Sequence, residues 1–208
     1  MIDAELLAAA AAGLVALTAL SLLVMWSWRL RLLALTAQYV GVFLLVDVSW
    51  PVELAMTKLI AGWIVVIVLW TALAGQAEGE IQAARSSQRS NWLRSNELPG
   101  AVLRFLAALM VITAAVSILP LAVGWLDSRD TLSILGGLIL LGLGMLHLGM
   151  SARPFGVCLG LLTVSSGFEV LYAVVETSAM VAGLQAAINL GLSLAISYIL
   201  IAPVEDSA

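Results

Sequence analysis

The chain has little of what most catalytic and metal sites are built from. Its 208 residues include one cysteine and one histidine, and only 11% are charged. One cysteine forms no internal disulfide bond, and without C-x-x-C or H-E-x-x-H spacing no metal site or cofactor is predicted. One histidine supports no Ser-His-Asp arrangement, so an enzyme is the least favoured class. We interpret His147, within the apolar stretch GMLHLGM, as a helix-packing residue rather than a ligand.

Positive charge is also scarce. Lysine and arginine total 9 against 13 acidic residues, giving a net charge of -4. Outside one loop no basic surface suited to nucleic acid is present, so no nucleic-acid partner is predicted.

Apolar residues, in contrast, are abundant. They make up 62% of the chain, and the mean hydropathy is +1.11, whereas soluble domains are about half apolar and a quarter charged. Segments of about 20 apolar residues, enough to cross a roughly 30 Å hydrocarbon core, recur along the chain. We therefore expect an all-α, polytopic transmembrane bundle of about seven spans in the lipid bilayer. The predicted spans are 5–27, 31–48, 51–74, 100–124, 131–150, 155–176 and 180–202.

The spans predict one integral membrane domain over residues 1–208. Three helices fill 1–74, a polar cytoplasmic loop fills 75–99, and four helices follow in 100–208. The first span is not expected to be a cleaved signal peptide, because Asp3 and Glu5 stand where a basic region is needed. No convincing internal repeat is visible in the sequence.

The basic residues predict the orientation. Seven of them lie in or beside the loops after the first, third and fifth spans, whereas the opposite side holds Arg129, between two aspartates, and Lys58 within a span. Because basic residues favour the cytoplasmic side, we expect the N-terminus outside and the C-terminus inside. The seven are Arg29, Arg31, Arg85, Arg89, Arg94, Arg104 and Arg153.

Two rows of four-residue spacing run along the last span. One row is small and the other polar, and an offset of two positions separates them by about 200° around the helix. We expect small residues to face one helix and polar residues another, so that this span is packed in protein on both sides. The small row is Gly183, Ala187, Gly191 and Ala195, and the polar row is Gln185, Asn189, Ser193 and Ser197.

The sixth span combines a small-residue pair with a polar stripe. Gly156 and Gly160 form a GxxxG pair that predicts close helix packing. The stripe follows helical i, i+3, i+4 spacing. It consists of Ser165, Ser166, Glu169, Tyr172 and Glu176.

The two glutamates of this stripe have different expected roles. An ionised carboxylate at membrane depth costs several kcal/mol unless it is paired, solvated or protonated, so Glu169 is expected to face the bundle interior. Two interpretations are open for Glu169: proton handling, or a buried carboxylic acid hydrogen-bonded to a neighbouring helix. Glu176 lies near the outer end and is interpreted as an interface charge.

Lys58 is the other charge within a span. It lies about 10 Å below the outer boundary if its helix starts at Pro51. Geometry favours a lysine that snorkels toward the surface and pairs with Asp47 or Glu53. The alternative is a place in a proton or ion path, since burial favours the neutral form of a lysine.

Three short motifs together form a recognisable pattern: the stretch AGLVALTALSLLVMWSWRL followed by Gln38, the pair Thr57 and Lys58, and GVCLGLL at 156–162. With these motifs the chain resembles a known membrane protein family, hydrogenase-4 component E. The last three spans, 131–202, are similar to the K-type component of complex I and the C-type component of Mrp cation/proton antiporters. The resemblance covers most of the chain, and it implies other membrane subunits as partners, among them an antiporter-like one, in a prokaryotic inner membrane.

Two positions depart from the K-type pattern. The K-type proteins carry a glutamate in each of the last two helices, thought to carry protons, where this chain has Thr163 and Asn189. Neither side chain titrates near neutral pH. Glu169 lies about 240° around the helix from Thr163, so it does not replace the missing carboxylate on the same face. The departure favours a packing role beside a larger channel-forming subunit.

Two functional hypotheses follow. The first is a non-catalytic membrane subunit of a complex I-like, Mrp-like or membrane-bound hydrogenase-type assembly, packed against an antiporter-like partner. The second is a stand-alone small transporter or channel with a path past Lys58, Glu169 and Asn189. The second needs inverted repeats or broken helices, which the sequence does not display. We therefore favour the first.

Overall fold

The computed structural model describes residues 2–25, 27–86, 98–126 and 130–202. In these ranges the chain is helical and holds seven helices, all long and apolar enough to cross a membrane. The predicted all-α fold of seven spans is therefore confirmed, and the chain is an integral membrane protein. The helices are α1 (Ile2–Val24), α2 (Trp28–Asp47), α3 (Val52–Ser86), α4 (Leu98–Leu126), α5 (Thr131–Met150), α6 (Pro154–Val175) and α7 (Ala179–Ile201).

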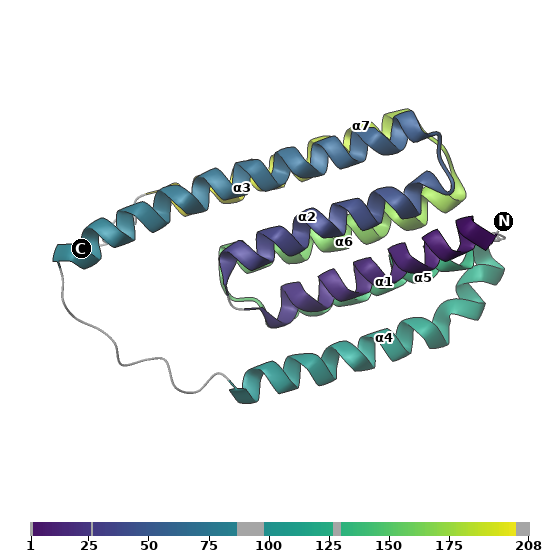
Figure 1. Ribbon diagram of the computed structural model, residues 1–208, viewed down its shortest axis with the longest axis horizontal. Coiled ribbons are helices and arrows are strands. Elements are labelled where there is room, and N and C mark those ends of the chain that lie inside the picture. The colour runs from purple at the N-terminus through teal and green to yellow at the C-terminus, as the bar shows by residue number, and fades with distance from the viewer. Residues whose placement is uncertain (1, 26, 87–97, 127–129, 203–208) are drawn as a thin grey trace.

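The helices form two layers of three with α4 at the side (Figure 1). In one layer α1, α2 and α3 follow one another, and in the other α5, α6 and α7 do so. Between the layers α1 packs against α5, α2 against α6 and α3 against α7. Because α4 carries the chain back to the end where α1 begins, each of these pairs runs in the same direction.

The third helix is longer than predicted. It continues to Ser86, although its apolar part ends at Gly75. The predicted loop over 75–99 was therefore wrong for residues 75–86, and also for residues 98–99, which belong to α4. These residues, GQAEGEIQAARS, are polar, but they are rich in good helix formers and lack proline. Falling hydropathy marks where the chain leaves the apolar layer, and it does not mark the helix end. Residues 87–97 of that segment, like Arg129, lie outside the described residues.

Glycines bring α5 and α6 into close contact. A Cβ atom on Gly160 would lie 2.9 Å from Leu148 Cδ2, and one on Gly167 would lie 2.6 Å from the backbone nitrogen of Leu141. At Gly156 the nearest atom is the Ser151 hydroxyl oxygen, 2.8 Å away. Gly160 therefore packs closely against α5, whereas the atoms that crowd Gly156 belong to the Ser151 side chain, directly after α5.

The fourth helix lies at the edge of the bundle, against α5 and α1. It is the least buried of the seven spans. Pro120 lies inside it, and Figure 1 shows the helix bending toward its C-terminal end, as expected for a proline within a helix.

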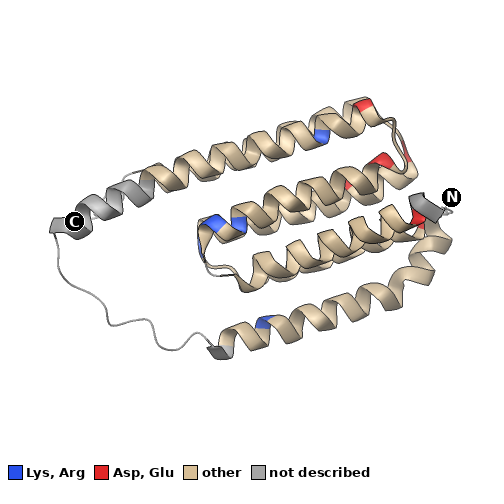
Figure 2. Cartoon of the chain, viewed as in Figure 1, with Lys and Arg blue, Asp and Glu red and all other residues tan. Residues whose placement is uncertain are grey.

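Charges of opposite sign gather at opposite ends of the bundle (Figure 2). Helices α2 and α6 begin beside Arg29, Arg31 and Arg153, and we call this the arginine end. The other end, the acidic end, holds Asp47 at the close of α2, together with Glu53 and Glu176. Which end faces the cytoplasm stays a prediction of the positive-inside bias.

Candidate functional site: a polar core between the layers

The centre of the site is a buried ion pair. Lys58 Nζ on α3 lies 2.6 Å from Glu169 Oε1 on α6, and each side chain is only 5% exposed. The ammonium group also lies 6.0 Å from the centre of the Trp50 ring, within reach of a cation–π interaction. The Trp50 indole nitrogen in turn donates to the carbonyl oxygens of Ala173 and Glu176, both at 3.1 Å.

This pairing corrects one prediction and confirms another. The expected snorkelling of Lys58 toward Asp47 or Glu53 was wrong, because the lysine is buried and its partner is Glu169. Lys58 stands six residues after the start of α3 and Glu169 six before the end of α6, so both lie about 9 Å from the acidic end. Glu53 is exposed on α3. The prediction that Glu169 faces the bundle interior is confirmed.

Burial makes the two charges depend on each other. Removing either charge from water is expensive, and mutual attraction offsets this cost only when the geometry is good. The space beside the pair is about 10 Å³ and is bounded by Trp50, Phe168 and Gln185. That is room for about one water molecule. Within the described residues the pair is therefore enclosed almost entirely by protein.

Deeper in the bundle, α6 and α7 share a hydrogen-bonded group. The Ser165 hydroxyl donates to Asn189 Oδ1 at 2.6 Å, and Gln185 Nε2 donates to the same hydroxyl at 2.6 Å. Gln185 Nε2 also lies 3.2 Å from the Ser165 carbonyl oxygen. All four residues of the α7 polar row are buried, which confirms that this row faces protein.

A second polar contact joins α2 to α6. Gln38 Nε2 donates to the Thr163 hydroxyl at 3.4 Å, and Gln38 is completely buried. Within the described part of the chain, Gln38 Oε1 and the hydroxyl of the neighbouring Tyr39 have no hydrogen-bond partner. Gln38 was named from the sequence only in the resemblance, and neither Tyr39 nor Trp50 was selected as a site residue. A polar atom within an apolar run was the signal that could have identified Gln38 and Tyr39.

The remaining predicted residues lie elsewhere. Glu176 is exposed at the acidic end, as predicted, and accepts a hydrogen bond from the Tyr172 hydroxyl at 3.2 Å. His147 is buried near the arginine end and lines a different pocket. Asp47 is partly exposed where α2 ends. None of these three belongs to the ion pair.

The small row of α7 lies open. Gly183, Ala187, Gly191 and Ala195 are all exposed, and no heavy atom of the described chain lies within 4 Å of a Cβ built on Gly183 or Gly191. The expectation that α7 is packed in protein on both sides is therefore met only on its polar side within this chain.

The chemistry available here is that of a buried polar column. A carboxylate and an ammonium group lie near the acidic end, and hydroxyl and amide groups continue toward the middle of the bundle. These groups can hold a proton or hydrogen-bond a neighbouring helix. Across the described ranges no cluster of three or more histidine, cysteine, aspartate or glutamate residues could hold a metal ion.

No family model, curated protein or solved structure matches the chain.

Proposed function

We propose that the chain is a non-catalytic integral membrane subunit of an ion-translocating assembly, and that α7 packs against an antiporter-like partner. The observation that supports this proposal is the open small row of α7. In lipid, helices associate through small residues that let backbones approach closely, because lipid tails are as apolar as leucine and supply no hydrophobic drive. A row of four small residues with open space at Gly183 and Gly191 offers such a surface.

The kind of assembly follows from the resemblance in the sequence. Hydrogenase-4 component E and the K-type and C-type proteins all suggest a complex I-like, Mrp-like or membrane-bound hydrogenase-type complex in a prokaryotic inner membrane. The arginine end then faces the cytoplasm. Thr163 and Asn189, which stand where K-type proteins have glutamates, both make hydrogen bonds between helices. Neutral, hydrogen-bonded side chains at these positions support a packing role for this chain.

The experiment is co-purification of a tagged full-length chain in mild detergent, followed by mass spectrometry. We expect large antiporter-like subunits in stoichiometric amounts with the wild type and with Gly124→Leu. Gly124 is a matched control because its Cβ would also meet open space, but on α4. We expect Gly191→Leu to lose the partner while the chain itself stays folded.

Two outcomes would overturn the proposal. One is recovery of the wild-type chain alone, monodisperse and stable. The other is recovery of partners that are equally abundant with Gly191→Leu and with the wild type, which would mean that α7 does not form the contact.

A stand-alone transporter is the second candidate, and the polar column favours it. Lys58, Glu169, Ser165 and Asn189 lie along one route from the acidic end to the middle of the bundle. If the chain transports ions by itself, the purified wild type reconstituted in vesicles should carry a proton or sodium flux, and Glu169→Gln should abolish it. If the chain is a packing subunit, neither the wild type nor Glu169→Gln should carry a proton or sodium flux by itself.

A further inference from the structure

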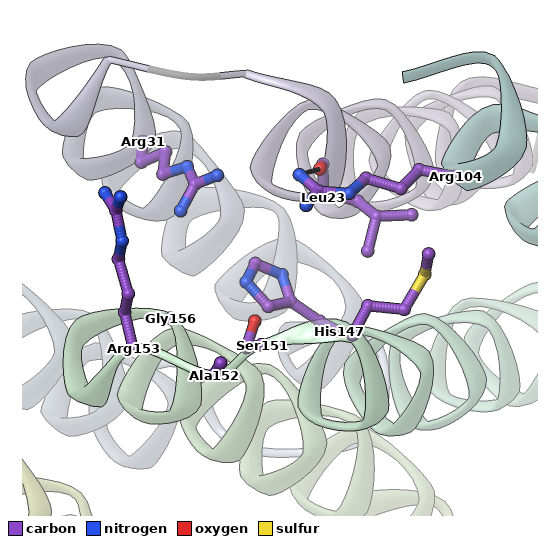
Figure 3. Close-up of a pocket in the computed structure, with 9 residues that line it drawn as sticks. Leu23, Arg31, Arg104, His147, Ser151, Ala152, Arg153 and Gly156 are labelled. Carbon is purple, nitrogen blue, oxygen red and sulfur yellow. Dashed lines mark hydrogen bonds between the residues drawn. The ribbon is translucent and has the colours of Figure 1, made fainter. Parts of the chain in front are cut away.

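A pocket at the arginine end has no role in the polar core. It has a volume of about 210 Å³ and is lined by three arginines and the one histidine, which come from different elements. Arg31 lies on α2, Arg104 on α4, His147 on α5, and Arg153 directly before α6. Figure 3 shows these four side chains converging on the same space. Of the described residues that line it, none is acidic. We call this space the arginine pocket.

Two arginines of the pocket are held in place by the end of α1. Arg31 Nε donates to the Met25 carbonyl oxygen at 2.6 Å, and an Arg104 terminal nitrogen donates to the Leu23 carbonyl oxygen at 3.5 Å. The last carbonyls of a helix lack partners within the helix and attract positive charge. Each of these bonds uses one of the five N–H donors of a guanidinium group. Capping α1 therefore uses one N–H donor of Arg31 and one of Arg104.

The chemistry of the lining selects a phosphate group. A guanidinium group binds phosphate through two parallel N–H···O bonds, and several arginines around one space match the charge and oxygen atoms of a phosphate. The Ser151 side chain also lies on the wall of the pocket and adds a hydroxyl donor.

The position of the pocket indicates that the phosphate belongs to a lipid. Arg104 is flanked on α4 by the exposed side chains of Val102, Leu103, Phe105 and Leu106. These residues lie on a membrane-spanning helix at the edge of the bundle, where acyl chains can run along them. Basic pockets between transmembrane helices at one membrane face bind the headgroups of anionic lipids. We propose that the arginine pocket binds the phosphate group of an anionic phospholipid, with its acyl chains along α4.

The test uses the purified full-length chain in mild detergent, with lipid binding followed by native mass spectrometry. We expect phosphatidylglycerol and cardiolipin to bind, and phosphatidylcholine, whose headgroup has no net charge, to bind more weakly. Arg104→Gln should weaken phosphatidylglycerol binding by about 10-fold, because it removes charge-assisted hydrogen bonds. Arg29→Gln is the matched control, since Arg29 is exposed at the same end and does not line the pocket; its binding should equal that of the wild type.

A second variant distinguishes a loss of lipid contacts from a loss of folding. Arg104→Lys keeps the positive charge without the planar fork of donors, and it should bind the lipid more weakly than the wild type while remaining folded. The lipid assignment is overturned if inorganic phosphate displaces phosphatidylglycerol at equal concentration, because the ligand would then be free phosphate. It is also overturned if Arg104→Gln and Arg31→Gln both bind the lipid as tightly as the wild type does.

Discussion

The ion pair of Lys58 and Glu169 should behave as a single unit in a double-mutant cycle. Each side chain is 5% exposed, and the two charged atoms lie 2.6 Å apart. Removing one member of such a pair leaves an uncompensated buried charge, which costs about 3–5 kcal/mol. We therefore expect this loss for Lys58→Met and for Glu169→Leu. The double variant removes both charges and should be about as stable as the wild type, or more stable.

The chain supplies its own probe for this measurement. Cys158 is the only cysteine and is completely buried on α6. Its labelling by a maleimide in mild detergent therefore requires the bundle to open, and the labelling rate follows the open population when closing is fast. A loss of 3–5 kcal/mol corresponds to labelling that is roughly 10²- to 10⁴-fold faster.

Glu53→Gln is the matched control for this cycle. Glu53 lies on the same helix as Lys58 but is exposed, so its replacement should change stability by less than about 0.5 kcal/mol. The reasoning fails if Lys58→Met labels at the wild-type rate. It also fails if the loss in the double variant equals the sum of the two single losses, since the charges would then be independent.

Three further changes can be measured with the same labelling assay. Gly167→Ala should lose about 1–3 kcal/mol, because the added methyl group meets backbone atoms of α5 that cannot move aside, whereas Gly191→Ala meets open space and should lose nothing. Trp50→Phe removes the donor to two carbonyl oxygens at the end of α6 and should lose about 1 kcal/mol. Asn189→Ala removes the acceptor of the partly buried Ser165 hydroxyl and should lose about 1 kcal/mol; wild-type labelling rates would contradict each expected loss.

The spans could be predicted because they depend on local composition. An apolar run of the right length is stable only as a membrane helix, so hydropathy alone placed α5 at Thr131–Met150 and the ends of α6 and α7 within a residue or so. The end of α3 was missed for the opposite reason. Beyond Gly75 the chain leaves the apolar layer, and helix propensity rather than hydropathy decides how far the helix continues.

The partner of Lys58 could not be predicted, because it depends on how the layers stack. Glu169 is 111 residues away in the chain, whereas Asp47 and Glu53 are close in sequence and on the same side. Nothing in a single sequence states that α3 and α6 meet at the same depth. What the sequence did identify was the burial of Glu169, since the cost of a carboxylate in lipid is a local property.

The arginine pocket could be predicted only in part. The positions of Arg31, Arg104 and Arg153 in the sequence predict that they lie on one side of the membrane, and this indicated only the orientation of the chain. The structure adds that they line one space, which depends on the contact of α4 with α5 and α1.

The separation of Lys58 and Glu169 along the chain also means that the lysine is synthesised well before its carboxylate partner. At ~5–20 residues per second, the 111 residues that separate them take the ribosome roughly 6–20 s to add. During this interval Lys58 lacks its carboxylate partner. A lysine at the centre of a membrane helix costs about 2.5–3.5 kcal/mol, and Lys58 should cost less because it lies six residues after the start of α3. Synthesis of α6 then supplies the carboxylate, so the two layers become joined by charge only after α4 and α5 have been made.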